Sequence, residues 1–145
     1  MDWAQFDRGV YLVNVLGIVY DVRNNLILIG RREQDPHIKE LSWCFPGGRP
    51  KYGEDLEEGL KREIRTKTGL DVRVNKLIFA RAYPERKEFL SLFYECEVIG
   101  GELKAGELFV ECKWIAPTAV SEYFTTSIHP KIMNYLRAIE KATYP

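Results

Sequence analysis

The sequence predicts an α/β protein in which helices pack on the faces of a mixed β-sheet. Two observations carry this prediction. Apolar, β-rich segments recur along most of the chain, while residues 54–69 and 130–141 show apolar residues at helical spacing. No internal repeat, low-complexity tract or linker divides these segments. We therefore expect one domain over residues 1–145.

Six strands are expected from runs of β-branched and aromatic residues bounded by Gly, Pro, Asn or Asp. In chain order they are residues 10–20, 26–30, 43–45, 72–83, 89–98 and 111–115. The first is apolar on both faces, as a buried strand would be. Asn24-Asn25 predicts a tight turn before the second strand, because asparagine tolerates positive φ.

The clearest helix precedes Gly69, a residue suited to the left-handed stop of a helix. Glu54 or Asp55 supplies its N-cap, and further acidic residues fill the first turn, where the helix dipole favours them. Three residues at i, i+4 and i+8 predict the buried stripe: Leu56, Leu60 and Ile64. A small helical segment is expected near residues 119–123, after Pro117.

The charge balance excludes whole classes of partner. The 145 residues include 21 basic and 21 acidic side chains, so the formal net charge is zero. General nucleic-acid binding and binding to anionic membranes need a basic excess, and neither is expected. A local basic pocket for a phosphorylated small molecule is compatible with this balance.

Cysteine usage and hydropathy predict a cytoplasmic protein. The three cysteines form no C-x-x-C pair, which argues against a disulfide framework and a structural zinc site. The apolar run over residues 10–20 is interrupted by Asn14 and falls well short of the roughly 20 residues that span a bilayer. We expect neither a signal peptide nor a membrane anchor.

One stretch carries a family resemblance. Residues 47–70 read GGRPKYGEDLEEGLKREIRTKTGL. Their spacing resembles the Nudix hydrolase signature, G-x5-E-x7-R-E-U-x-E-E-x-G-U, in which U is a bulky apolar residue. Seven of the nine specified positions match: Gly48, Glu54, Arg62, Glu63, Ile64, Gly69 and Leu70. The resemblance implies a Nudix α/β/α sandwich. It also implies a hydrolase of nucleoside diphosphates linked to another group X, or of nucleoside triphosphates, that uses Mg²⁺ or Mn²⁺.

Two positions depart from the signature. Thr66 and Lys67 stand where the family places a pair of metal-binding glutamates, so only Glu63 remains of three. Three glutamates would carry three negative charges, whereas the charges of Glu63, Thr66 and Lys67 sum to zero. Lys67 lies four residues after Glu63, the orientation that favours an ion pair on a helix. We expect its ammonium to disfavour the cation there and to weaken the metal site.

The resemblance also suggests roles for other residues. Glu107 and Glu111 precede or open a late strand ending in Trp, where family members often place a further acid. With Glu63 and the Gly48 carbonyl, either would make a weaker single-metal site. The remaining positions of the box are expected to be structural. Arg62 and Glu54 brace the loop against the helix, Gly47 and Gly48 permit a close backbone path, and Gly69 ends the helix.

Substrate contacts are predicted from one strand end and the loop after it. Arg31, Arg32 and His37 resemble the nucleotide-contacting residues of family members that act on nucleoside triphosphates. Arginine suits phosphate because its planar fork donates two hydrogen bonds at once. The alternative is that the arginines are ordinary surface charges and His37 a plain loop residue.

Three functional hypotheses follow. The first is a phosphoanhydride hydrolase of a nucleotide or nucleotide sugar, with Glu63 as ligand or base. The second is a non-catalytic Nudix-fold module that binds a nucleotide-like ligand or a protein partner. The third is a nucleotide-sugar hydrolase that needs a single metal ion. A homodimer is a further expectation, because many relatives dimerise.

Overall fold

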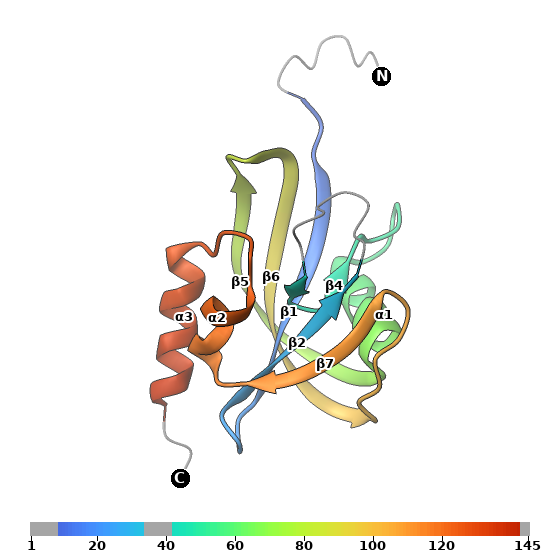
Figure 1. The fold of residues 1–145 in the computed structure, drawn as a ribbon. Helices are drawn as coiled ribbons and strands as arrows, with labels where there is room; N and C mark the ends of the chain where they lie inside the picture. The colour runs from blue at the N-terminus through green and yellow to red at the C-terminus, as the bar shows by residue number, and fades with distance from the viewer. Residues whose placement is uncertain (1–8, 34–41, 143–145) are drawn as a thin grey trace.

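The computed structural model describes residues 9–33 and 42–142, and Figure 1 shows their arrangement. Within these residues seven strands form one sheet, in the order β3-β2-β1-β6-β5, with β4 paired to β1 and β7 to β2. The strands are β1 (Leu12–Asp21), β2 (Leu26–Arg32), β3 (Trp43–Cys44), β4 (Gly47–Gly48), β5 (Leu70–Tyr83), β6 (Arg86–Gly101) and β7 (Phe109–Ile115).

The sheet is mixed because its central pair, β1 and β6, is parallel, while every other recorded pair is antiparallel. The parallel register runs from Leu12 opposite Phe89 to Val19 opposite Cys96. Parallel strands are normally buried on both faces. Val15, Ile18 and Val19 of β1 accordingly have no exposed surface.

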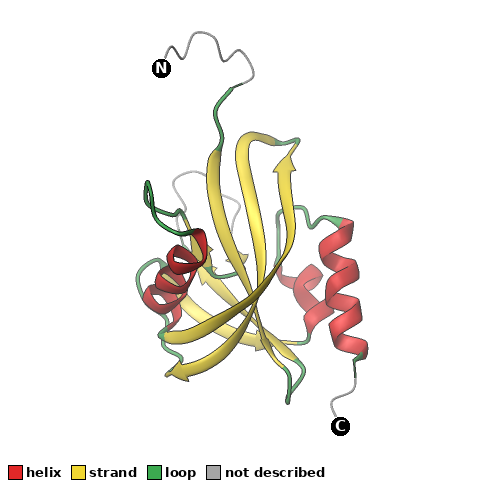
Figure 2. Ribbon diagram, turned by 180° about the vertical axis from the view of Figure 1, so that it is seen from behind, coloured by secondary structure: helices red, strands yellow, loops and turns green. Residues whose placement is uncertain are grey.

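Helices cover both faces of this sheet. Helix α1 (Leu56–Thr68) packs on one face. The 3₁₀ turn η2 (Pro117–Ala119) and the helices α2 (Val120–Tyr123) and α3 (Pro130–Lys141) lie on the other, as Figures 1 and 2 show from opposite sides. The predicted α/β fold, a mixed sheet between helical layers, is confirmed.

Helix α1 begins and ends where its local chemistry predicts. Asp55, one of the two expected caps, accepts a hydrogen bond from the Glu58 N–H at 3.0 Å. Gly69 ends the helix in the left-handed conformation with φ of 78° and donates its N–H to the Arg65 carbonyl at 2.9 Å. These two termini fix the helix in sequence, and therefore fix which residues face the sheet.

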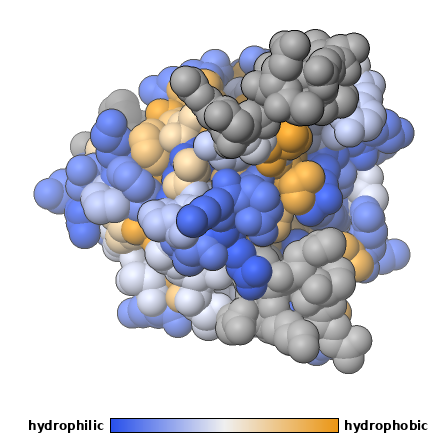
Figure 3. Space-filling model, turned by 90° about the horizontal axis from the view of Figure 1, so that it is seen from above, coloured by the Kyte–Doolittle hydropathy of each residue, from blue (hydrophilic) through white to orange (hydrophobic). Residues whose placement is uncertain are grey.

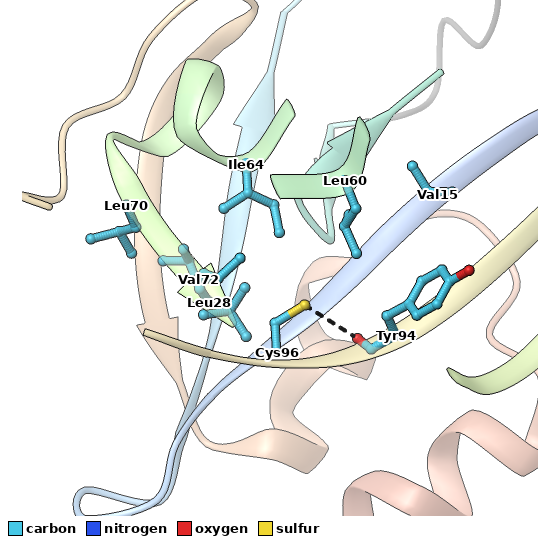
Figure 4. Close-up of a cluster of buried hydrophobic side chains, with 9 residues drawn as sticks. Val15, Leu28, Leu60, Ile64, Leu70, Val72, Tyr94 and Cys96 are labelled. Atoms are coloured by element: carbon cyan, nitrogen blue, oxygen red, sulfur yellow. Dashed lines mark hydrogen bonds between the residues drawn. The ribbon is translucent and has the colours of Figure 1, made fainter. Parts of the chain in front are cut away.

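The buried stripe of α1 consists of Leu60, Ile64 and Thr68, none of which has exposed surface. Figure 4 shows Leu60 and Ile64 directed from the helix toward side chains of the sheet. Burying a residue of this size contributes about 1.5–3 kcal/mol. The expectation that Leu56 belongs to the stripe is wrong. Leu56 is the first helical residue and is 38% exposed, so the buried face begins one turn later.

The second half of the sheet is longer than the sequence predicts. Strand β5 starts two residues before the predicted range 72–83 and ends at Tyr83 as predicted, whereas β6 extends three residues beyond the predicted range 89–98 at each end. The turn between the two strands occupies only residues 84–85. The polar segment that begins at Arg86 belongs to β6, where Arg86 pairs with Tyr83. In the part of the chain that the structure describes, no helix is both long and apolar enough to cross a membrane.

Candidate active site

A pocket of about 910 Å³ lies beside β4 and the C-terminal half of α1. Its volume is in the range of small-molecule sites. The pocket wall is completed by the ends of β5 and β6 and by residues 124–129, which precede α3. Of the described residues that line it, five are basic and one is acidic: Arg32, Arg49, Lys67, Arg81, Arg86 and Glu85. The pocket is therefore suited to an anionic ligand.

Aromatic side chains form much of the remaining wall. They come from five segments: Phe45, Tyr83, Phe89, Phe93, Phe109 and Phe124. Figure 3 shows hydrophobic and hydrophilic side chains next to one another on the upper end of the molecule. A pocket that combines basic groups with aromatic faces suits a ligand with both phosphates and an aromatic or sugar ring.

Glu54 and Arg62 brace the loop between β4 and α1. The Glu54 carboxylate accepts two hydrogen bonds from the Arg62 guanidinium, at 3.0 and 3.1 Å, and one from the Lys51 N–H at 2.9 Å. These bonds, that from Arg62 above all, lower the pKa of Glu54 to about 2. The carboxylate is therefore ionised at neutral pH and ties the loop to the helix.

The two glycines of β4 permit close approaches of different kinds. A Cβ on Gly47 would stand 2.0 Å from the Val15 carbonyl oxygen, so β4 can pair with β1 only without a side chain there. A Cβ on Gly48 would stand 2.6 Å from the carboxyl carbon of Glu63. Gly48 therefore leaves the space in which the Glu63 carboxylate sits against the strand.

Two cations flank that carboxylate. One Glu63 oxygen lies 3.3 Å from Nη1 of Arg62, and the other lies 3.6 Å from Nζ of Lys67. Lys67 also donates a hydrogen bond to the Gly47 carbonyl oxygen at 2.5 Å. The side chains of Lys67 and Glu63 are only 8% and 14% exposed. The predicted ion pair is thus present, and it is nearly buried beside the glycine strand.

The donor set does not fit a cluster of divalent metal ions. Mg²⁺ and Mn²⁺ need oxygen ligands, chiefly carboxylates. Over residues 9–33 and 42–142, no group of three or more His, Cys, Asp or Glu side chains lies close enough to hold a metal. Thr66 turns its hydroxyl back to the Arg62 carbonyl, and the Lys67 ammonium contacts both Glu63 and the β4 backbone.

The other predicted acids lie in different surroundings. Glu111, on β7, accepts a hydrogen bond from Nε of Arg31 at 3.2 Å, and Arg31 also contacts Glu33. Glu107 lies in the turn before β7 with φ of 53°. Neither acid forms a recorded contact with Glu63, and their catalytic roles stay predictions.

The two arginines predicted to contact substrate lie on opposite faces of β2. Neighbouring residues of a strand point to opposite faces, so Arg31 faces Glu111 while Arg32 lines the pocket. His37 lies outside the described residues. Substrate binding by these three residues stays a prediction.

Three basic residues of the pocket were not predicted from the sequence: Arg49, Arg81 and Arg86. Arg81 is almost buried, donates to the carbonyl and hydroxyl of Ser127 at 2.9 and 2.8 Å, and lies over the Tyr83 ring at 4.2 Å. The alternation of side chains along a strand could have predicted that Arg81 and Tyr83 lie together, because both are on one face of β5. No local pattern indicates which face meets the loop that contains Ser127.

Comparison with known proteins identifies the family. The family model described as the NUDIX domain matches residues 10–136, which is most of the chain. The chain belongs to the Nudix family. The resemblance of the box is thereby confirmed, and with it membership of a family of nucleotide-directed hydrolases.

Two relatives are similar to this chain over large parts of its length. An ADP-ribose pyrophosphatase of Methanocaldococcus jannaschii is 38% identical over 59% of this chain and 51% of its own. The chain therefore matches about half the length of that relative. A nucleoside triphosphatase, NudI, of Escherichia coli is 29% identical over 66% of this chain and 77% of its own.

A solved Nudix-type structure has the same fold. The MutT protein from Methanosarcina mazei superposes with a TM-score of 0.74, covering 93% of this chain and 99% of that chain. The two are 17% identical. At this identity the likeness concerns the fold, and the chemistry of the site has to be argued from the residues of this chain.

Proposed function

We propose that this Nudix protein binds a nucleoside diphosphate-X or a nucleoside triphosphate in its basic pocket and hydrolyses a phosphoanhydride bond of that ligand. One observation carries the proposal. The phosphate-suited part of the pocket, with Arg49 and Lys67, adjoins Gly48 and Glu63 of the Nudix box. Aromatic side chains line the same pocket and suit the nucleoside end of such a ligand.

Family relatives support the reaction class. The similar proteins of M. jannaschii and E. coli are named a pyrophosphatase and a triphosphatase. In such a reaction the oxygen of water forms a new bond to phosphorus, the bridging P–O bond breaks, and the leaving phosphate takes the electron pair. Glu63 is the proposed acceptor of the proton from water, because it is the one glutamate left of the family's three metal-binding glutamates and its carboxylate lies against Gly48, which lines the pocket.

The proposed cofactor is Mg²⁺ or Mn²⁺, which would neutralise phosphate oxygens when bound. Glu63 and the Gly48 carbonyl are its candidate protein ligands. The residues present do not assemble further carboxylates around them, so no step is assigned to the metal. A site weakened in this way is part of the proposal.

A second function is favoured by one specific contact. Lys67 forms an ion pair with Glu63 and a hydrogen bond with the Gly47 carbonyl, where the family binds its cation. A chain with this arrangement suits a non-catalytic module that retains its nucleotide-like ligand or binds a protein partner. The other alternative from the sequence, a nucleotide-sugar hydrolase with a single metal ion, uses the same pocket.

Turnover measurements distinguish these functions. The native chain, Glu63→Gln and Thr66→Glu/Lys67→Glu are compared with Mg²⁺ or Mn²⁺ on ADP-ribose, UDP-sugars and nucleoside triphosphates. Glu58→Gln is a matched control, because Glu58 lies on the same helix but is exposed and pairs with Lys61. Native turnover that Glu63→Gln abolishes and Glu58→Gln retains supports hydrolysis. Binding without turnover, with turnover only after both glutamates are restored, supports the non-catalytic module.

Further predictions from the sequence complete the proposal. The ligand is a small nucleotide or nucleotide sugar, and neither general nucleic-acid binding nor membrane binding is expected. The chain forms one domain over residues 1–145 and assembles as a homodimer. Its location is the cytoplasm.

A further inference from the structure

The ammonium of Lys67 has hydrogen-bonding capacity to spare at the pocket. An ammonium carries three N–H donors. One of them bonds the Gly47 carbonyl, while Glu63 lies at 3.6 Å, within ion-pair range but beyond hydrogen-bond length. Lys67 lines the pocket even though its side chain is 8% exposed. The Lys67 ammonium is therefore nearly desolvated, and it has N–H groups left that can donate hydrogen bonds to the oxygen atoms of a bound anion.

The partners of that ammonium are oxygen atoms of the kind a divalent cation binds. They are the carboxylate of Glu63 and a backbone carbonyl of β4. Helix geometry explains why the Lys67 ammonium reaches these oxygen atoms, because residue 67 lies one turn after Glu63 on the same face of the helix. A lysine there brings its positive charge to the point where a glutamate would have brought a second negative charge.

We infer that the Lys67 ammonium takes the place of a divalent cation and binds the diphosphate of the ligand directly. The pocket then binds a nucleoside diphosphate without any divalent metal ion. The proposed cofactor, with Glu63 and the Gly48 carbonyl as candidate ligands, would serve hydrolysis and not binding. This inference rests on the proposed function and deepens it, because it concerns how the same pocket recognises phosphate.

Two arginines support direct recognition of phosphate at this place. Arg49 follows Gly48 directly, and Arg32 ends β2; both line the pocket with Lys67. With Glu63 included, these four side chains carry a net positive charge. A multiply charged diphosphate is therefore matched by fixed cations of the protein, and the bonds to it are charge-assisted and strong.

Isothermal titration calorimetry with the full chain tests the inference. The probes are ADP, UDP and inorganic pyrophosphate, each titrated in EDTA and in Mg²⁺. We expect at least one nucleoside diphosphate to bind in EDTA, and Mg²⁺ to tighten that binding by less than about tenfold. Lys67→Met is expected to weaken binding in EDTA by about 10- to 100-fold, the effect of losing a charge-assisted bond.

Two further variants sharpen this test. Lys61→Met removes an exposed lysine of the same helix, so it is expected to leave affinity unchanged. Thr66→Glu/Lys67→Glu is expected to abolish binding in EDTA and to restore it with Mg²⁺ or Mn²⁺. Circular dichroism checks that every variant is folded. If Lys67→Met does not fold, side-chain ¹⁵N NMR of native Lys67 replaces it, with a shift of the Nζ resonance expected on adding ADP in EDTA.

The outcomes separate this inference from the proposed function. Binding of the nucleoside diphosphates only in Mg²⁺ would overturn the role of Lys67 and leave the nucleotide pocket intact. Unchanged affinity of Lys67→Met in EDTA, or an unmoved Nζ resonance, would overturn it as well. Absence of binding to every probe in both buffers would instead overturn the proposed function.

Discussion

Replacing Gly47 with alanine tests whether β4 holds the site in place. The new Cβ would stand 2.0 Å from the Val15 carbonyl oxygen, and real contacts of this kind do not fall below 3.0 Å. Strand β4 must therefore retreat by about 1 Å. That movement breaks its pairing with β1 and strains the 2.8 Å bond from the Gly17 N–H to the Pro46 carbonyl.

The expected loss of stability follows from the hydrogen bonds that are broken. Each internal hydrogen bond contributes about 0.5–1.5 kcal/mol, so losing two or three costs about 2–4 kcal/mol. Urea denaturation followed by circular dichroism measures it. With a slope of about 2 kcal/mol per molar, the midpoint is expected to fall by about 1–2 M.

Gly48→Ala is the matched control for Gly47→Ala. Its Cβ would meet the Glu63 carboxylate, which is the far end of a flexible side chain and can turn away. We expect a stability loss below about 1 kcal/mol, together with weaker ligand binding because Glu63 and its partner Lys67 are displaced. A Gly47→Ala protein as stable as the native chain, or a Gly48→Ala protein that loses more stability, would refute the reasoning.

Three further predictions concern charged and buried groups. Arg62→Met is expected to raise the pKa of Glu54 from about 2 toward the usual value near 4.3, as measured by carboxyl NMR. Because the folded-state pKa of Glu54 is lowered, its contribution to native stability is present above about pH 4.3 and is lost as the pH falls toward 2. A Glu54 pKa that Arg62→Met leaves unchanged would contradict the role of Arg62 in lowering it. Arg81→Met removes the bonds to Ser127, so amide hydrogen exchange of residues 124–129 is expected to quicken with a loss of about 1.5–3 kcal/mol, whereas Arg73→Met, on the exposed part of β5, should leave that exchange unchanged. Burial raises the pKa of Cys96 to about 12, so peptide mass spectrometry should find Cys96 unlabelled by a thiol reagent at pH 8 until urea is added; prompt labelling of the folded protein would contradict its burial.

Local chemistry made the helices predictable from the sequence. The side chain of Asp55 and the glycine at 69 set the ends of α1, and the periodic apolar residues after Pro130 set α3. Long-range pairing made the strands harder to predict. Arg86 opens a polar segment that resembles a turn in isolation, yet it pairs with Tyr83 inside the sheet. Strand β4 has two residues, too few for any periodic signal.

Some contacts of the candidate site are likewise predictable from the sequence, and others depend on the fold. The family resemblance of the box implies the brace between Glu54 and Arg62, and helical spacing predicts the pair between Glu63 and Lys67. The bond from Lys67 to the Gly47 carbonyl spans 20 residues and depends on how α1 docks on the sheet. Arg49 and Arg81 come from separate segments, and only the folded chain shows that both line one pocket.

The central claim is that the ammonium of Lys67, and not a divalent cation between Glu63 and Gly47, meets the phosphates of the ligand. The most direct measurement is anomalous diffraction from crystals grown with a non-hydrolysable nucleoside diphosphate analogue and Mn²⁺. The account predicts phosphate oxygens within hydrogen-bond distance of the Lys67 Nζ, and no manganese peak between the Glu63 carboxylate and the Gly47 carbonyl. A manganese peak at that position, with Lys67 turned away from Glu63, would contradict it.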